Sequence, residues 1–318
     1  LRMFSSDEDA APSERLFSDE RLPLDRLKEM SMNIDGRLDR LDSSVISAKD
    51  LEFKGKLSNG LLNVDMSSAS MNGGRGKLNL LLDTAATPTA LEVDMDFREI
   101  RGLTGGDTYP RSGFMTIRTA GNSTAELAAA ADGVVYLELG EGPFDYANSA
   151  ILTADIASSV FRNLVPGIET QEPTLECGVA AAVFQKGVGL TPYGYALRTN
   201  SANIIGRIEL DLRKETMQLN FDSRGREGVG ISVGSVFSNT VLVRGSLTDP
   251  SIVPNTTSII WRGWAAFMTA GLSIVGESVI KRALASDNPC RSIKRLITED
   301  LCPKSPRAAK SDLVCPQN

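Results

Sequence analysis

Two glycine-rich stretches are the first candidates for a nucleotide-binding site, because glycine-rich loops can hold phosphate groups. Residues 74–78 (GRGKL) lack the spacing of a phosphate-binding loop and its Ser or Thr. Residues 228–234 (GVGISVG) do not match the GxGxxG pattern, and no helical pattern follows them. We interpret both stretches as turn or bulge glycines.

Acid–base chemistry would need paired carboxylates or histidine. Asp94 with Asp96, and Glu209 with Asp211, are each two residues apart, so each pair shares one face of a strand. Such a face is typical of the solvated side of an amphipathic sheet. Histidine is absent, which excludes Ser-His-Asp and Cys-His catalysis and histidine-bound metals. We therefore expect a protein that is not an enzyme and that has no cofactor or metal.

The four cysteines are the remaining reactive side chains. They lack CxxC spacing, which argues against a zinc site. Their even number favours disulfides formed in an oxidising compartment, with unpaired thiols as the alternative. A helix over about 290–299 would hold Cys290 and Cys302 too far apart to bridge. We expect the pairs Cys177 with Cys290 and Cys302 with Cys315.

Composition limits the function classes further. The 318 residues are 42% hydrophobic and 23% charged, which is typical of a folded chain. The net charge of −6 and the absence of a basic stripe with aromatic residues argue against nucleic-acid binding. No apolar run is long enough to span a bilayer. Because the chain begins at Leu1, we interpret it as a piece whose membrane anchor, if any, lay upstream.

Residues 51–97 predict the elements around which the chain is organised. Apolar and charged residues alternate in four segments, and Asn59-Gly60 and Asn72-Gly73 separate the first three. Asn-Gly between alternating segments predicts a hairpin. The four strands should form an antiparallel meander with one apolar face, which must be buried against a partner, and one charged face, which keeps the protein soluble.

The same pattern extends over most of the chain. Residues 1–16 read as a linker, and 17–255 as one β-groove domain with strands over 30–119 and 134–247. A short helix is expected at about 123–131, where Ser123 and Glu126 form a capping box, and an amphipathic helix at 148–164. The fold class is mainly β: an antiparallel meander curved into an open, taco-like groove with a few amphipathic helices, one of them near the C-terminus.

The C-terminal region predicts a helix and a tail. Residues 256–286 form an amphipathic helix whose uncharged centre is too short to span a bilayer. Membrane contact through this helix is one interpretation, and closure of the open end of the sheet is the other. Residues 287–318 form a tail with cysteines, prolines and a short helix. The expected membrane-contacting side chains are Trp261, Trp264, Phe267 and Met268.

Several phrases of the sequence resemble the C-terminal region of the AsmA family. They are FSDERLPLDRL followed by an alternating strand, FKGKLSNGLLNVDMSSASMNGGRGKLNLLLD, LECGVAAAVFQKGVGLT, IIGRIELDLRKETMQLNF, VLVRGSLTDPSIVP and SDNPC. Together they cover about 17–97 and 174–290, in an order that is similar to that of the family.

The resemblance implies a protein of the bacterial envelope. Members carry an inner-membrane helix and a periplasmic β-groove that is thought to carry phospholipid acyl chains between the inner and outer membranes. This chain lacks that anchor and most of the length of a full bridge, so it would be the distal part. Its expected partners are phospholipids, the inner membrane through the missing anchor and envelope proteins, and its location is the periplasm.

Two functions are therefore expected as alternatives. The first is a lipid conduit that supports outer-membrane integrity. The second is a scaffold for envelope assembly, built as a β-sandwich whose apolar faces pack on each other. The residues expected to line the lipid groove are Ile34, Leu38, Leu51, Phe53, Leu57, Leu62, Val64, Met66, Leu78, Leu80, Leu82, Leu91, Val93, Met95, Phe97, Ile204, Ile208, Leu210 and Leu212.

Overall fold

The structure, a computed structural model, describes residues 15–42, 47–101, 109–143, 174–226, 238–253, 282–283, 285–304, 313 and 315. Side chains at 69 and 238–240 are also outside this description. The helix expected at 148–164, nearly all of the helix expected at 256–286 with its four membrane-contacting side chains, and most of the linker 1–16 lie outside the described residues.

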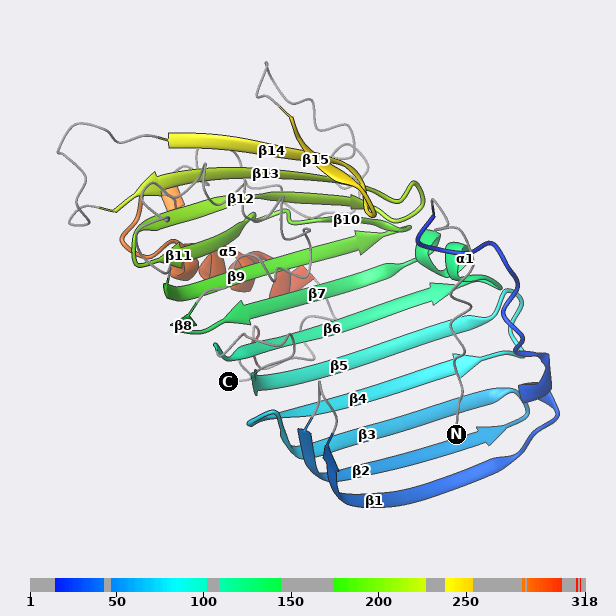
Figure 1. Cartoon of the computed structure of the whole chain (residues 1–318). Helices are drawn as coiled ribbons and strands as arrows, with labels where there is room; N and C mark the ends of the chain where they lie inside the picture. Colours follow the sequence, from blue (N-terminus) through cyan, green and yellow to red (C-terminus); the bar gives the residue numbers. More distant parts are fainter. Residues whose placement is uncertain are drawn as a thin grey trace.

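The described strands form one large antiparallel sheet, which is curved and twisted (Figure 1). The expectation of a mainly β meander is confirmed. The order is β1-β2-β3-β4-β5-β6-β7-β9-β10-β12-β13-β14-β15, while β11 pairs with β9 and β12, and β8 pairs with β9. The strands are β1 Met32–Asp42, β2 Ser47–Ser58, β3 Leu61–Met71, β4 Gly74–Asp83, β5 Ala90–Ile100, β6 Arg111–Ala120, β7 Asp132–Leu139, β8 Gly142–Pro143, β9 Thr174–Gln185, β10 Val188–Leu190, β11 Tyr195–Thr199, β12 Ala202–Asp211, β13 Thr216–Gly225, β14 Ser238–Ser246 and β15 Pro250–Val253.

Hairpin turns connect the first strands as the sequence predicts. Asn59 and Gly60 have φ values of 51° and 78°, and Asn72 and Gly73 have 45° and 81°. Two successive positive φ values define the type I′ turn, which Asn-Gly adopts readily and which matches the twist of the flanking strands. These turns fix the registers β2–β3 and β3–β4.

The described helices are short except for the last. The 3₁₀ helix η1 (Asp25–Lys28) precedes β1, and α1 (Thr124–Ala129) lies at one end of the sheet. The Ser123 side chain accepts a hydrogen bond from the Glu126 N–H, as the capping box predicts. Helix α5 (Pro289–Lys304) is longer than the short helix expected at about 290–299.

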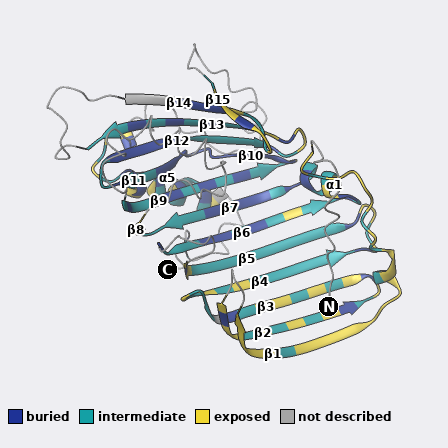
Figure 2. Cartoon of the chain, in the orientation of Figure 1, coloured by how far each residue is buried: buried dark blue, intermediate teal, exposed yellow. Residues whose placement is uncertain are grey.

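The core lies toward the C-terminal half of the sheet, where buried residues predominate, whereas β1 is largely exposed and β2 and β3 are mostly exposed or half-buried (Figure 2). One cluster packs α5 against β6, β7, β9, β10, β11 and β12, and includes Tyr136, Val179, Ile293 and Ile297. A second cluster on β11 to β14 includes Ile204, Leu219 and Val243.

A strap over Arg15–Leu24 runs along the end of the sheet that carries α1. The backbones of Ser18 and Ala125 are joined by a hydrogen bond of 3.0 Å, and those of Leu22 and Asn122 by one of 2.8 Å. At its start the strap contacts the β12–β13 turn through Glu215, and it then leads to η1 and β1. The strap therefore links the beginning and the later part of the sheet.

Candidate functional site

One row of directly opposed residues crosses every strand of the path from β1 to β15. We call it the apolar row, and the side of the sheet that carries it the apolar face. Because opposed residues lie on the same face, the row follows from the strand registers. It contains no polar side chain: Ile34, Gly55, Val64, Leu80, Val93, Ile117, Gly133, Phe184, Gly189, Leu210, Met217, Gly245 and Pro250.

The adjacent row lies on the opposite face, and we call it the mixed row. Its composition differs from that of the apolar row. It is polar over β1 to β6, apolar over β7 to β10 and polar again afterwards. Its members are Asp35, Lys54, Asp65, Asn79, Asp94, Thr116, Val134, Val183, Leu190, Glu209, Gln218, Arg244 and Ser251. The expected charged face therefore exists over β1 to β5, but the expectation is wrong in the middle of the sheet.

Helix α5 is the reason for the apolar middle of the opposite face. Ile293, Ile297 and Leu301 are fully buried against the side that carries Val179 and Val183. The signal for this covering was present in the sequence, because residues 178–184 (GVAAAVF) are apolar without alternation. A continuous apolar run is typical of a strand that is buried on both faces.

The structure brings nearly all of the expected groove residues together. Alternation along the paired strands places them on the apolar face, in the apolar row or the rows beside it. Leu212 is the exception, because β12 ends at Asp211 and Leu212 lies in the following turn.

Exposure on the apolar face changes along the sheet. At the β1 end the side chains are partly open: Ile34 is 40% exposed, Leu38 43% and Met66 36%. Val64, Leu80 and Val93 are half-buried. Met217 and Leu219, farther along, are buried. Over β1 to β6 the described part of the apolar face is thus a partly exposed aliphatic surface, with Leu57 buried at one end of β2.

At three places on the apolar face a phenylalanine ring lies close to an opposed glycine. Gly36 faces Phe53, Gly113 faces Phe97, and Gly189 faces Phe184. In each pair the ring lies so close that a Cβ on the glycine would meet a ring atom at 2.3–2.7 Å. The rings therefore lie over the glycine backbone, an arrangement that protects glycine in a strand.

Ionic contacts secure α5 to the opposite face. Lys294 pairs with Glu138 on β7, and the Tyr193 hydroxyl donates a hydrogen bond of 2.9 Å to Asp300. Tyr136, which is buried beside Glu138, donates a hydrogen bond to its carboxylate. Burial, together with the neighbouring carboxylate, raises the pKa of Tyr136 and of Tyr193, so both hydroxyls stay protonated and act as donors.

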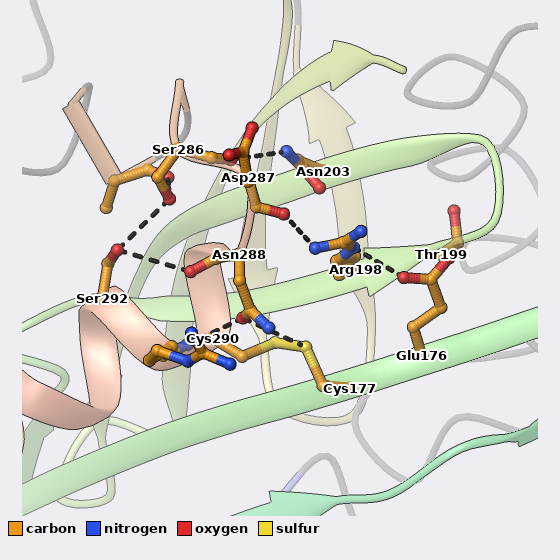
Figure 3. Close-up of a disulfide and its surroundings, with 12 residues drawn as sticks. Glu176, Cys177, Arg198, Thr199, Asn203, Ser286, Asp287, Asn288, Cys290 and Ser292 are labelled. Atoms are coloured by element: carbon orange, nitrogen blue, oxygen red, sulfur yellow. Dashed lines mark hydrogen bonds and ion pairs between the residues drawn. A yellow bond between two sulfur atoms is a disulfide. The ribbon is translucent and has the colours of Figure 1, made fainter. Parts of the chain in front are cut away.

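The expected cysteine pairs are present as disulfides. Cys177 on β9 is bonded to Cys290 at the start of α5, and Cys302 is bonded to Cys315. Around the first disulfide, Arg198 pairs with Glu176 at 2.6 Å and donates to the Asp287 carbonyl oxygen (Figure 3). These contacts hold the N-terminal end of α5 covalently and electrostatically against the sheet.

Asp96 and Asp211, two of the carboxylates singled out in the sequence, have basic partners. Asp96 pairs with Arg98 at 2.9 Å, and Asp211 accepts hydrogen bonds from the Arg213 guanidinium at 3.0 and 2.9 Å. Burial opposes ionisation of Asp211, but Arg213 outweighs it and lowers the pKa. Burial, and then the charge of Asp211, raises the pKa of Glu209.

A cavity of about 580 Å³ lies on the opposite face over β2 to β6. Three consecutive residues of each of these strands line the cavity. The first and third of them, such as Glu52 and Lys54 in β2, lie on the opposite face. Its charges have both signs. Among the described residues, no cluster of acidic or cysteine side chains is arranged to hold a metal ion. No helix in the described ranges is long and apolar enough to cross a membrane.

The apolar face therefore presents a row without a polar side chain across the paired strands. Comparisons with known protein families, with curated proteins and with solved structures found no match for the chain.

Proposed function

We propose that this chain is the distal part of an AsmA-like lipid-transfer protein of the bacterial envelope. Its apolar face carries phospholipid acyl chains through the periplasm between the inner and outer membranes, and thereby supports outer-membrane integrity. In the full protein an upstream helix anchors it to the inner membrane. The single observation that carries the proposal is the apolar row, which crosses the whole strand path without a polar side chain.

The dimensions of the apolar face suit lipid tails. Thirteen paired strands, spaced about 4.8 Å apart, give a row of roughly 60 Å, about twice the thickness of the hydrocarbon core of a bilayer. Removing one CH₂ group from water is worth about 0.8 kcal/mol. An acyl chain on this face is therefore held by its length, without a polar group that would fix it at one point, and it can slide.

The composition of the face supports the same function. Leucine, valine and methionine predominate among its half-buried positions, and the rings of Phe53, Phe97 and Phe184 lie over opposed glycines. Methionine is flexible and polarisable, so it adapts to chains of different shape. The alternative scaffold requires two sheets packed face to face, whereas the described strands belong to a single sheet.

Site-specific photocrosslinking in cells tests the proposal. A photoreactive residue at Leu80, in the apolar row, should yield phospholipid adducts. Asn79 is adjacent on the opposite face, where its side chain donates to Asp65 at 2.6 Å, and should yield none. Leu81 is a matched control, because it is also a leucine and faces Glu92 and Asn63 on the opposite face.

Two outcomes would count against lipid transfer. Adducts at none of the three sites in a folded protein would favour a scaffold that binds no lipid. Equal adducts at Leu80 and Leu81 would indicate nonspecific contact with membranes rather than binding to the apolar face.

A further inference from the structure

Three methionines gather on the apolar face over β3 to β6. Met66 lies on β3, Met95 on β5 and Met115 on β6. The strand registers set Met66 opposite Leu78, Leu78 opposite Met95, and Met95 opposite Met115. The three methionines, which we call the methionine patch, therefore lie in one row, although they are far apart in the chain. This row is next to the apolar row, because Leu78 and Leu80 share one face of β4.

The methionine patch is accessible from solvent, whereas a methionine farther along the same face is not. Met66 is 36% exposed, and Met95 and Met115 are half-buried. Met217, in the apolar row on β13, is only 6% exposed. The strands β3, β5 and β6 each pair with a neighbour on both sides. The exposure of the patch is therefore a property of the sheet face and does not come from a free edge.

Methionine holds the remaining reduced sulfur of this chain, because all four cysteines are paired in the two disulfides. Hypochlorous acid oxidises a thioether to a sulfoxide. The sulfur forms a bond to the oxygen of the oxidant, the oxygen–chlorine bond breaks, and chloride and a proton are released. The reaction converts a flexible apolar side chain into a polar one, which disrupts surfaces rich in methionine.

We propose that the methionine patch is an oxidation site, at which hypochlorous acid lowers the affinity of the apolar face for acyl chains. This inference rests on the proposed function, since both concern the same face. Val64, Val93 and Ile117 of the apolar row each lie two residues from a patch methionine on the same strand. A sulfoxide oxygen beside this row is a hydrogen-bond acceptor, and an acyl chain that covers it offers no donor.

Limited oxidation of the full 318-residue chain by hypochlorous acid tests this site. Peptide mapping by mass spectrometry should find Met66 oxidised first, Met95 and Met115 next, and Met217 last. After the oxidant is removed, the chain should bind parinaric acid, a fluorescent fatty acid, about fivefold more weakly or worse than before oxidation. A chain with Met66→Leu, Met95→Leu and Met115→Leu, which conserve apolar volume, should bind parinaric acid equally before and after oxidation.

Met30→Leu is the matched control, because Met30 is 46% exposed but lies between η1 and β1, outside the sheet. This variant should lose affinity on oxidation as the wild type does. Circular dichroism before and after oxidation checks that each chain stays folded. If the triple variant does not fold, Met66→Leu alone should still reduce the loss of affinity.

The outcomes separate this inference from the proposed function. Oxidation of Met217 as fast as Met66, or an oxidised, folded wild-type chain that binds parinaric acid as strongly as before, would overturn the inference alone. A wild-type chain that binds no parinaric acid before oxidation would contradict the proposed function, and the inference with it.

Discussion

Gly113 shows how a single hydrogen atom in place of a side chain shapes the apolar face. It is buried on β6 opposite Phe97, and a Cβ at this position would meet the Tyr136 carbonyl oxygen at 2.5 Å and the Phe97 ring at 2.7 Å. Gly55, on the same face, is different, because a Cβ there would have only Ile34 at 3.9 Å. At Gly113, therefore, neighbouring atoms leave no room for a side chain, whereas at Gly55 a small side chain would fit.

The first prediction follows from this contrast. Gly113→Ala should lower the free energy of unfolding by about 1–3 kcal/mol, because the added methyl group overpacks against backbone that cannot move away. Gly55→Ala should be neutral or slightly stabilising, since alanine restricts the unfolded chain without a clash. Urea unfolding at pH 7 measures both. Equal effects of the two substitutions would contradict the assigned packing.

Glu215 is the residue that holds the strap to the sheet. Its side chain is buried and accepts hydrogen bonds from the backbone N–H groups of Leu16 and Phe17 and from the Arg15 guanidinium. Burial raises the pKa of the carboxyl, but these donors outweigh burial, so the pKa lies below the ordinary value of 4.5.

A lowered pKa gives the second prediction a definite direction. The ionised carboxylate stabilises the fold fully above pH of about 4.5, and this contribution is lost as the pH falls through the lower pKa of the folded state. Glu215→Gln should lower the free energy of unfolding by about 1–2 kcal/mol at pH 7, and the difference from the wild type should shrink below pH 4.5. Urea unfolding across this range measures the difference.

Glu20→Gln provides the control, because Glu20 is an exposed carboxylate in the same strap. It should leave stability unchanged at every pH. A Glu215→Gln chain whose deficit persists undiminished in acid would show that the ionised carboxylate is not the stabilising group.

At the scale of elements, two disulfides restrain α5, one at each end of the helix. The Cys177–Cys290 bond spans 113 residues and attaches the helix to β9, a strand in the interior of the sheet. The Cys302–Cys315 bond spans 13 residues at the other end of the helix. Restricting the unfolded chain stabilises a fold more when the closed loop is longer.

The third prediction compares the two bonds. Replacing Cys177 and Cys290 by alanine should cost about 4–5 kcal/mol of stability, and replacing Cys302 and Cys315 should cost about 3 kcal/mol. Guanidinium unfolding of the two double variants under oxidising conditions measures the order. A larger loss from the shorter loop would indicate that packing around Cys315, rather than chain restriction, dominates.

At the scale of the molecule, the two faces of one sheet have separate roles. In the part of the chain that the structure describes, the apolar face is partly exposed over β1 to β6, and it is the surface proposed for acyl chains. The opposite face is charged over β1 to β5 and covered by α5 farther along. Photocrosslinking at Leu80 and Leu81 tests this division.

The sequence by itself determined the local structure and one face of the sheet. Alternation around Leu80 and Val93, and the Asn-Gly turns, specify strands, hairpins and register through interactions between residues close in the chain. The opposite face needed the tertiary structure. Alternation shows which side chains share a face but not what covers it, and α5 reaches Val183 from more than a hundred residues away. The contacts of Glu215 with Leu16 likewise join distant segments, so only the fold decided them.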